Sequence, residues 1–163
     1  MALEFFRIDD RLIHGQVVVG WGQPCNLGFL VLVDADVVGS EWEQELYRMG
    51  VPPEMDLYFD SVESAARRIA EYRADARPGM LLVGDIATMA ALQAAVPDIR
   101  HVTIGGIHHK EGRRARLRYV FLTPDEERAL QALAARGVSV VAQDVPSAPA
   151  IPLAEVLAGD GTG

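Results

Sequence analysis

His14 lies in the segment of the chain with the clearest potential for chemistry, residues 7–17 (RIDDRLIHGQV). The segment follows a short apolar run and precedes a helix-like one, so it occupies the turn between a strand and a helix N-terminus. Free amides at a helix start and nearby arginine forks bind phosphate oxygens well. An imidazole nitrogen in that position can carry a phosphoryl group itself. The segment therefore predicts a catalytic histidine that forms a phosphohistidine intermediate.

The charged neighbours of His14 fit this chemistry. Phosphoryl transfer depends mainly on alignment of the attacking and leaving groups and on compensation of the negative charge of the phosphoryl oxygens. Arg7 and Arg11 could supply the compensating positive charge. Asp9 or Asp10 could hold the second ring nitrogen and fix its tautomer, as carboxylates do for other catalytic histidines. The same residues would also fit a surface ion-pair network, in which each pair contributes about 0–1 kcal/mol.

Gly15 and Gln16 follow the histidine directly and are the candidate phosphate-binding residues. Their backbone amides could donate to a developing anion at the helix start. Gly15 also lets a phosphate approach the backbone closely, because it has no side chain. A metal-assisted hydrolase that uses Asp9, Asp10 and His14 is a further, weaker hypothesis.

Composition and charge limit the classes of protein to which this chain can belong. The chain has 163 residues, 50% of them hydrophobic and 23% charged, which predicts one folded domain. A net charge of -8 argues against nucleic acid or an anionic membrane as the main partner. The single cysteine, Cys25, predicts a reducing compartment. With no leader-like N-terminus and no apolar run near the ~20 residues of a membrane span, we expect a cytoplasmic protein.

Strand-like and helix-like segments alternate along the chain. We expect strands at residues 3–8, 27–33, 55–59, 80–83, 101–104, 116–122 and 138–143. We expect helices at residues 15–22, 41–49, 62–73, 86–95 and 124–136, and a short one from Pro152. Residues 1–158 would form the domain and residues 159–163 a disordered tail.

This alternation predicts an α/β fold with a mostly parallel central sheet and helices on both faces. Ligands in such folds bind at the carboxyl ends of the strands. Because the loop that carries His14 follows the first strand, we expect it on that rim.

Residues 105–118 hold a second group of polar candidates. His108 and His109 are adjacent, and neighbours in an extended segment point to opposite faces, so a shared metal ion is not expected. A solvated loop, or one histidine near the phosphate, fits better. Residues 110–118 carry a local excess of positive charge, which by itself favours a solvated hairpin over a docking face for an acidic partner. The family resemblance given below makes the two interpretations equal. Gly105-Gly106 lacks the further spaced glycine of a dinucleotide-binding loop.

Several segments together resemble one protein family. Residues 7–17 resemble the active-site signature of the IIB components of the mannose/fructose/sorbose family of the bacterial phosphotransferase system (PTS). Residues 31–37, 105–113, 123–126 and 135–138 resemble later segments of that family in the same order.

The resemblance implies a sugar phosphotransferase component with no metal and no bound cofactor. His14 would accept a phosphoryl group from a IIA phosphohistidine and pass it to a sugar carried by the membrane subunits IIC and IID. The protein would then be peripheral to the membrane, and its sheet would have an antiparallel edge. A regulatory module whose phosphorylation state is read by another protein needs the same loop and stays an alternative. The identity of the sugar and the oligomeric state are open, with a homo-oligomer among the options.

Overall fold

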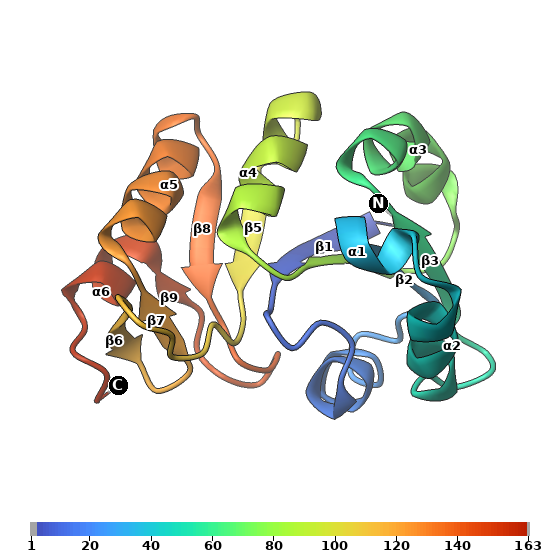
Figure 1. The fold of residues 1–163 in the computed structure, drawn as a ribbon, viewed down its shortest axis with the longest axis horizontal. Helices are drawn as coiled ribbons and strands as arrows, with labels where there is room; N and C mark the ends of the chain where they lie inside the picture. Colours follow the sequence, from blue (N-terminus) through green and yellow to red (C-terminus); the bar gives the residue numbers. More distant parts are fainter. Residues whose placement is uncertain (1–2, 163) are drawn as a thin grey trace.

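Seven strands form the central sheet, in the order β3-β2-β4-β1-β5-β8-β9 (Figure 1). The computed structural model describes residues 3–162. Six strands are parallel, and β9 at the edge runs antiparallel to β8, so the predicted antiparallel edge is confirmed. The strands are β1 (Leu3–Ile8), β2 (Phe29–Val33), β3 (Asp56–Asp60), β4 (Gly79–Val83), β5 (His101–Ile104), β8 (Ser139–Ala142) and β9 (Ile151–Pro152).

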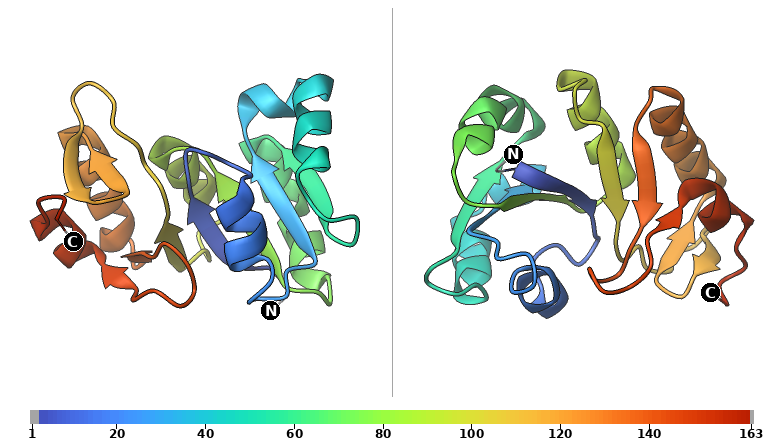
Figure 2. Two further views of the ribbon diagram at one scale, coloured as in Figure 1. Left: turned by 90° about the horizontal axis from the view of Figure 1, so that it is seen from below. Right: turned by 180° about the vertical axis from the view of Figure 1, so that it is seen from behind.

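Helices cover both faces of the sheet, which confirms the predicted fold class (Figure 2). One face packs against α3 (Val62–Ala74), α4 (Ile86–Ala95) and α5 (Pro124–Ala135). The other packs against the helical segment η1 (Gln16–Trp21), α1 (Ala35–Val38) and α2 (Glu41–Met49). Every residue of β2 and β4 is buried, as expected for central strands that lie between two helical layers.

Side-chain caps start the helices where the sequence predicts. Thr123 and Glu126 form a reciprocal capping box, with Pro124 at the first helical position of α5. Asp85 accepts a hydrogen bond from the Thr88 amide at the start of α4. Within residues 3–162, no helix combines the length and the apolar character needed to cross a membrane.

Four details differ from the expectations. Residues 116–122 are not one strand but belong to a separate antiparallel hairpin of β6 (Arg114–Leu117) and β7 (Val120–Leu122). The helix expected at residues 15–22 is a π-helix. The sequence does not predict the short elements α1 and β9. The short helix expected from Pro152 is present as α6 (Leu153–Ala158).

The predicted disorder of residues 159–163 stays a prediction. The structure places Gly159 and Gly161 against Arg116: the Arg116 guanidinium donates to the Gly159 carbonyl, and the Gly161 amide donates to the Arg116 carbonyl. Gly163 lies outside the described residues.

The chain leaves β1 and β5 in opposite directions. From β1 it passes through η1 on one face to β2, whereas from β5 it passes through α5 on the other face to β8. Since β1 and β5 are neighbours, their carboxyl ends mark the point where the connections diverge, and ligands of open α/β sheets bind at such points. The predicted loop around His14 starts there.

Candidate functional site

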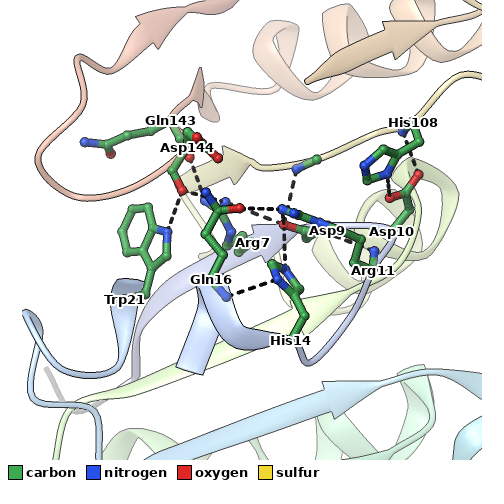
Figure 3. Close-up of polar contacts among 11 residues, drawn as sticks. Arg7, Asp9, Asp10, Arg11, His14, Gln16, Trp21, His108, Gln143 and Asp144 are labelled. Carbon is green, nitrogen blue, oxygen red and sulfur yellow. Dashed lines mark hydrogen bonds and ion pairs between the residues drawn. The ribbon is translucent and has the colours of Figure 1, made fainter. Parts of the chain in front are cut away.

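The Asp9 carboxylate is the centre of the polar cluster at the end of β1 (Figure 3). Asp9 is fully buried. It accepts hydrogen bonds from the backbone amide, Nε and Nη2 of Arg11, each at 3.1 Å, and from the amide of Gly106 at 3.2 Å. Two further cationic or ring nitrogens face it, Nη2 of Arg7 at 3.6 Å and Nε2 of His14 at 3.3 Å. One carboxylate therefore organises three of the predicted site residues.

These contacts determine the charge of Asp9. Burial by itself would raise the pKa of the carboxyl group, because desolvation penalises the ionised form. The approach of His14 and the hydrogen bonds from Arg11 outweigh burial and hold the pKa of Asp9 well below its ordinary value. The carboxylate is therefore ionised at neutral pH and faces the imidazole as an anion.

The His14 ring is held in one orientation. The backbone amide of Gln16 donates to Nδ1 at 3.3 Å, so Nδ1 presents its lone pair and the proton of the neutral ring lies on Nε2. Nε2 is buried against the Asp9 carboxylate. The His14 side chain as a whole is 17% exposed, so the ring is reachable from solvent. The geometry leaves Nδ1 as the ring nitrogen that faces away from Asp9.

The backbone around His14 is unusual at two points. Leu12 has a φ of 58°, in the left-handed region that costs a leucine on the order of 1–2 kcal/mol. Its side chain lies over Gly84 at the end of β4, where an added Cβ would come within 2.9 Å of it. After the turn, the His14 carbonyl accepts hydrogen bonds from the amides of Val17 and Val18 as η1 begins. π-helical turns are rare and occur often at functional sites.

Arg7 lies behind Asp9 and is 1% exposed. Its Nη1 and Nη2 donate to the backbone carbonyls of Gln143 and Asp144 at 2.7 and 3.1 Å. Its guanidinium also lies over the Trp21 ring, 4.8 Å from the centroid, and Trp21 Nε1 donates to the same Asp144 carbonyl at 2.9 Å. Burial lowers the pKa of Arg7, and the Asp9 carboxylate opposes that effect. Arg7 therefore connects Asp9 to the loop after β8 and does not reach the surface.

Arg11 is the arginine that faces outward. Its side chain is 34% exposed, and the hydrogen bonds to Asp9 raise its pKa. Its Nη2 also donates to the Gln16 side-chain oxygen at 2.9 Å, so Gln16 contacts both Arg11 and His14. Gly15 starts η1, and apart from its chain neighbours and the backbone of its own helix, no described atom lies within 4 Å of the place where a Cβ would be. Of the predicted phosphate-binding groups, Arg11, Gly15 and Gln16 therefore surround the open side of the ring.

Gly105 and Gly106 make room for the side chains of Arg7 and Arg11, a role that the sequence does not predict. A Cβ on Gly105 would lie 2.4 Å from Nη2 of Arg7 and 2.7 Å from Oδ2 of Asp9. A Cβ on Gly106 would lie 3.2 Å from the Arg11 guanidinium. The sequence signal for this role is the pair of consecutive glycines that directly follows the strand at residues 101–104, at the carboxyl end of the parallel strands.

Asp10 turns away from His14 and pairs with His108. It accepts a hydrogen bond from the His108 amide at 2.7 Å, and its Oδ1 lies 2.5 Å from Nδ1 of the same residue. Arg113 approaches Asp10 at 3.9 Å and donates to the His108 carbonyl at 2.7 Å. Of the two candidate aspartates, Asp9 therefore contacts the His14 ring, and Asp10 holds the loop after β5.

Other side chains of residues 108–118 pack against an aromatic ring or form ion pairs. The His109 ring packs edge-on against Phe121, with centroids 5.7 Å apart. Arg113 and Arg116 form paired contacts with Glu126 and Glu127 of α5, so two of the local cations are neutralised. Among residues 3–162, no three His, Cys, Asp or Glu side chains gather as metal ligands.

Comparisons with known proteins agree with this geometry. The family described as PTS system sorbose subfamily IIB component matches residues 3–162. The N-acetylgalactosamine-specific phosphotransferase enzyme IIB component 1 of Escherichia coli is 31% identical over 143 residues, which is 86% of this chain and 89% of that protein. A probable phosphotransferase enzyme IIB component of Streptococcus pyogenes is 32% identical, over 62% of each chain.

A solved structure shows the same fold. The IIB domain of the sorbose permease from Klebsiella pneumoniae superposes with a TM-score of 0.86 over 97% of each chain, at 26% identity. The match of residues 3–162 to the family and this superposition together establish the family membership that residues 7–17 indicate. The chain belongs to the sorbose-subfamily IIB components of the phosphotransferase system, a family of sugar phosphotransferase modules.

Proposed function

We propose that His14 carries a phosphoryl group on Nδ1, taken from a phosphohistidine of a IIA protein and passed to a sugar. The observation that supports this most directly is the orientation of the ring. Asp9 lies 3.3 Å from Nε2, and the Gln16 amide points at Nδ1 from 3.3 Å. A nucleophilic nitrogen needs a lone pair, and Nδ1 is the nitrogen that has it. The Gln16 amide, which donates to that lone pair in the unphosphorylated protein, would turn to a phosphoryl oxygen as the N–P bond forms.

The incoming step can be written on these atoms. Nδ1 of His14 attacks the phosphorus, the N–P bond of the donor histidine breaks, and the donor ring leaves with its electron pair. His14 keeps its proton on Nε2, so its ring gains positive charge as the new bond forms. The ionised Asp9 carboxylate at 3.3 Å stabilises that charge.

The phosphoryl oxygens would meet the outward-facing groups of the site. The Arg11 guanidinium compensates their charge, and the amides of Gly15 and Gln16 donate hydrogen bonds to them. The open space around Gly15 allows a phosphoryl group to come close to the backbone. Arg7 supports this arrangement indirectly, since it contacts Asp9 and the carbonyls of Gln143 and Asp144.

The partners follow from the family. The mannose-specific relative from Escherichia coli is named an EIIAB component, and the resemblance of this chain to IIB components implies IIA proteins and the membrane subunits IIC and IID as partners. We assign the same partners to this chain, and place it on the cytoplasmic side of the membrane, bound through IIC and IID. Its sedimentation with vesicles that contain those subunits, and not with empty vesicles, tests the assignment.

The decisive experiment uses a phosphorylated IIA protein as donor. His14→Ala is expected to abolish acceptance and to leave the far-ultraviolet circular dichroism spectrum unchanged. His101→Ala is the matched control. His101 is exposed at the start of β5, whereas His14 lies near the carboxyl ends of the parallel strands. Mass spectrometry under alkaline conditions locates the modified residue. Phosphate on the His14→Ala protein would refute the proposal.

A further inference from the structure

Asp10 and His108 form a second carboxylate–histidine pair beside the first. The Asp10 carboxylate binds His108 twice, at the backbone amide and at Nδ1 of the ring, at 2.7 and 2.5 Å. A carboxylate at Nδ1 places the proton of the neutral ring on that nitrogen and leaves the lone pair on Nε2. The His108 side chain is 55% exposed, so the free nitrogen is open to solvent and to a ligand.

This second pair borders the groups that surround His14. A Cβ on Gly106 would lie 3.2 Å from the Arg11 guanidinium and 3.3 Å from Cε1 of His108, so the two side chains flank the same glycine. Gly106 itself donates to Asp9, the partner of His14. Figure 3 shows both histidines near the end of β1, in one cluster with Asp9, Asp10 and Arg11. A sugar that meets a phosphoryl group on His14 would therefore lie near His108.

We propose that Nε2 of His108 is the general base for the sugar hydroxyl in the outgoing transfer. This inference rests on the proposed function of His14. In the step, the hydroxyl oxygen attacks phosphorus, the O–P bond forms, and the Nδ1–P bond of phospho-His14 breaks with its electrons returning to Nδ1. The hydroxyl proton moves to Nε2 of His108, and the exposed ring then releases it to water.

The base has a role in only one of the two half-reactions. The incoming transfer joins phosphorus to a ring nitrogen that already presents a lone pair, so no proton has to be removed. A sugar hydroxyl, in contrast, must lose its proton as the O–P bond forms. A general base contributes about 100-fold or more to such a step.

The test separates the two half-reactions in the variant His108→Asn. Asparagine keeps an N–H donor near the position of Nδ1, so the contact with Asp10 is retained, but it has no basic nitrogen. His109→Asn is the control, because that ring packs on Phe121. Acceptance is measured from a phosphorylated IIA protein. Discharge is measured in vesicles that contain the IIC and IID subunits, with sorbose, fructose, mannose and N-acetylgalactosamine as acceptors.

We expect His108→Asn to slow discharge to the sugar by about 100-fold, while the acceptance rate stays within about threefold of the wild type. Added imidazole should restore discharge in His108→Gly, a rescue that a purely structural role of the ring would not show. An equal loss in both half-reactions, discharge at the wild-type rate, or phosphate found on His108 would each overturn the inference.

The outcomes for the wild-type protein distinguish this inference from the proposed function. If His14 accepts phosphate but transfers it to none of the four sugars, there is no sugar hydroxyl for His108 to deprotonate, and the inference on His108 is refuted. Acceptance by His14 would then still stand. If His14 never carries phosphate, the proposed function itself is wrong.

Discussion

Oδ2 of Asp9 lies 3.3 Å from Nε2 of His14, on the buried side of the imidazole. The contact orients the ring and turns Nδ1 toward the amide of Gln16. One buried carboxylate thus determines which of the two ring nitrogens is available for chemistry.

This orientation predicts the position of the phosphoryl group. We expect phosphorylation on Nδ1, because Nε2 is buried against Asp9. Long-range ¹H–¹⁵N correlation spectra of the protein phosphorylated by its IIA donor distinguish the two isomers. A phosphoryl group on Nε2 would contradict the assigned ring orientation.

Asp9→Asn should destabilise the protein in a pH-dependent way. The substitution leaves the buried Arg7 without its carboxylate partner, and breaking a buried ion pair costs about 3 kcal/mol. Since the pKa of Asp9 is lowered in the folded state, the charged group stabilises the fold above its unfolded-state pKa, ordinarily 3.8, and this contribution is lost as pH falls through the lower folded-state pKa.

Urea unfolding of the wild type and of Asp9→Asn between pH 7 and pH 2.5 measures this effect. The difference in the free energy of unfolding between the two proteins should be constant from pH 7 to about pH 5 and should shrink at lower pH. A difference that grows on acidification would contradict the lowered pKa of Asp9.

Arg11→Lys should slow phosphoryl acceptance by at least about 10-fold, because lysine cannot contact both Asp9 and Gln16 with a planar fork. Arg48→Lys is the matched control: Arg48 pairs with Glu45 on the exposed side of α2. Quenched-flow transfer from the phosphorylated IIA protein gives both rates. Equal rates for the two variants would remove Arg11 from the mechanism.

Gly105→Ala should cost about 2 kcal/mol of stability, because the new methyl group would collide with the Arg7–Asp9 pair. At Gly39 the nearest atom to an added Cβ is 3.9 Å away, so Gly39→Ala should stay within about 0.5 kcal/mol of the wild type. Thermal and urea unfolding compare the two variants. A stable Gly105→Ala protein would show that the end of β5 can move away from Arg7.

The sequence predicts the fold well where local pattern and burial agree. β2 and β4 are buried on both faces, and a strand buried in this way is a continuous apolar run. The sequence predicts one strand over residues 116–122 in place of the hairpin of β6 and β7. The turn, Arg118-Tyr119, contains none of the usual turn residues, and the alternating pattern continues through it.

In the candidate site, too, some features could be predicted from the sequence and others could not. Its central residues lie within ten positions of one another, so their types and spacing were visible in the sequence. The carbonyl of Gln143 meets Arg7 across 136 residues, and His108 meets Asp10 across 98. A backbone carbonyl has no side-chain signature, and a contact between distant segments depends on the strand order, which places β1 beside β5.

Asp9 and Asp10 are consecutive, yet each holds a different histidine. Insertion of a single residue between Ile8, the last residue of β1, and Asp9 would turn both carboxylates away from their rings at once. Both histidines would then lose their partners through one change in segment length. The direct junction of β1 with the Asp-Asp step therefore sets the positions of both carboxylates together.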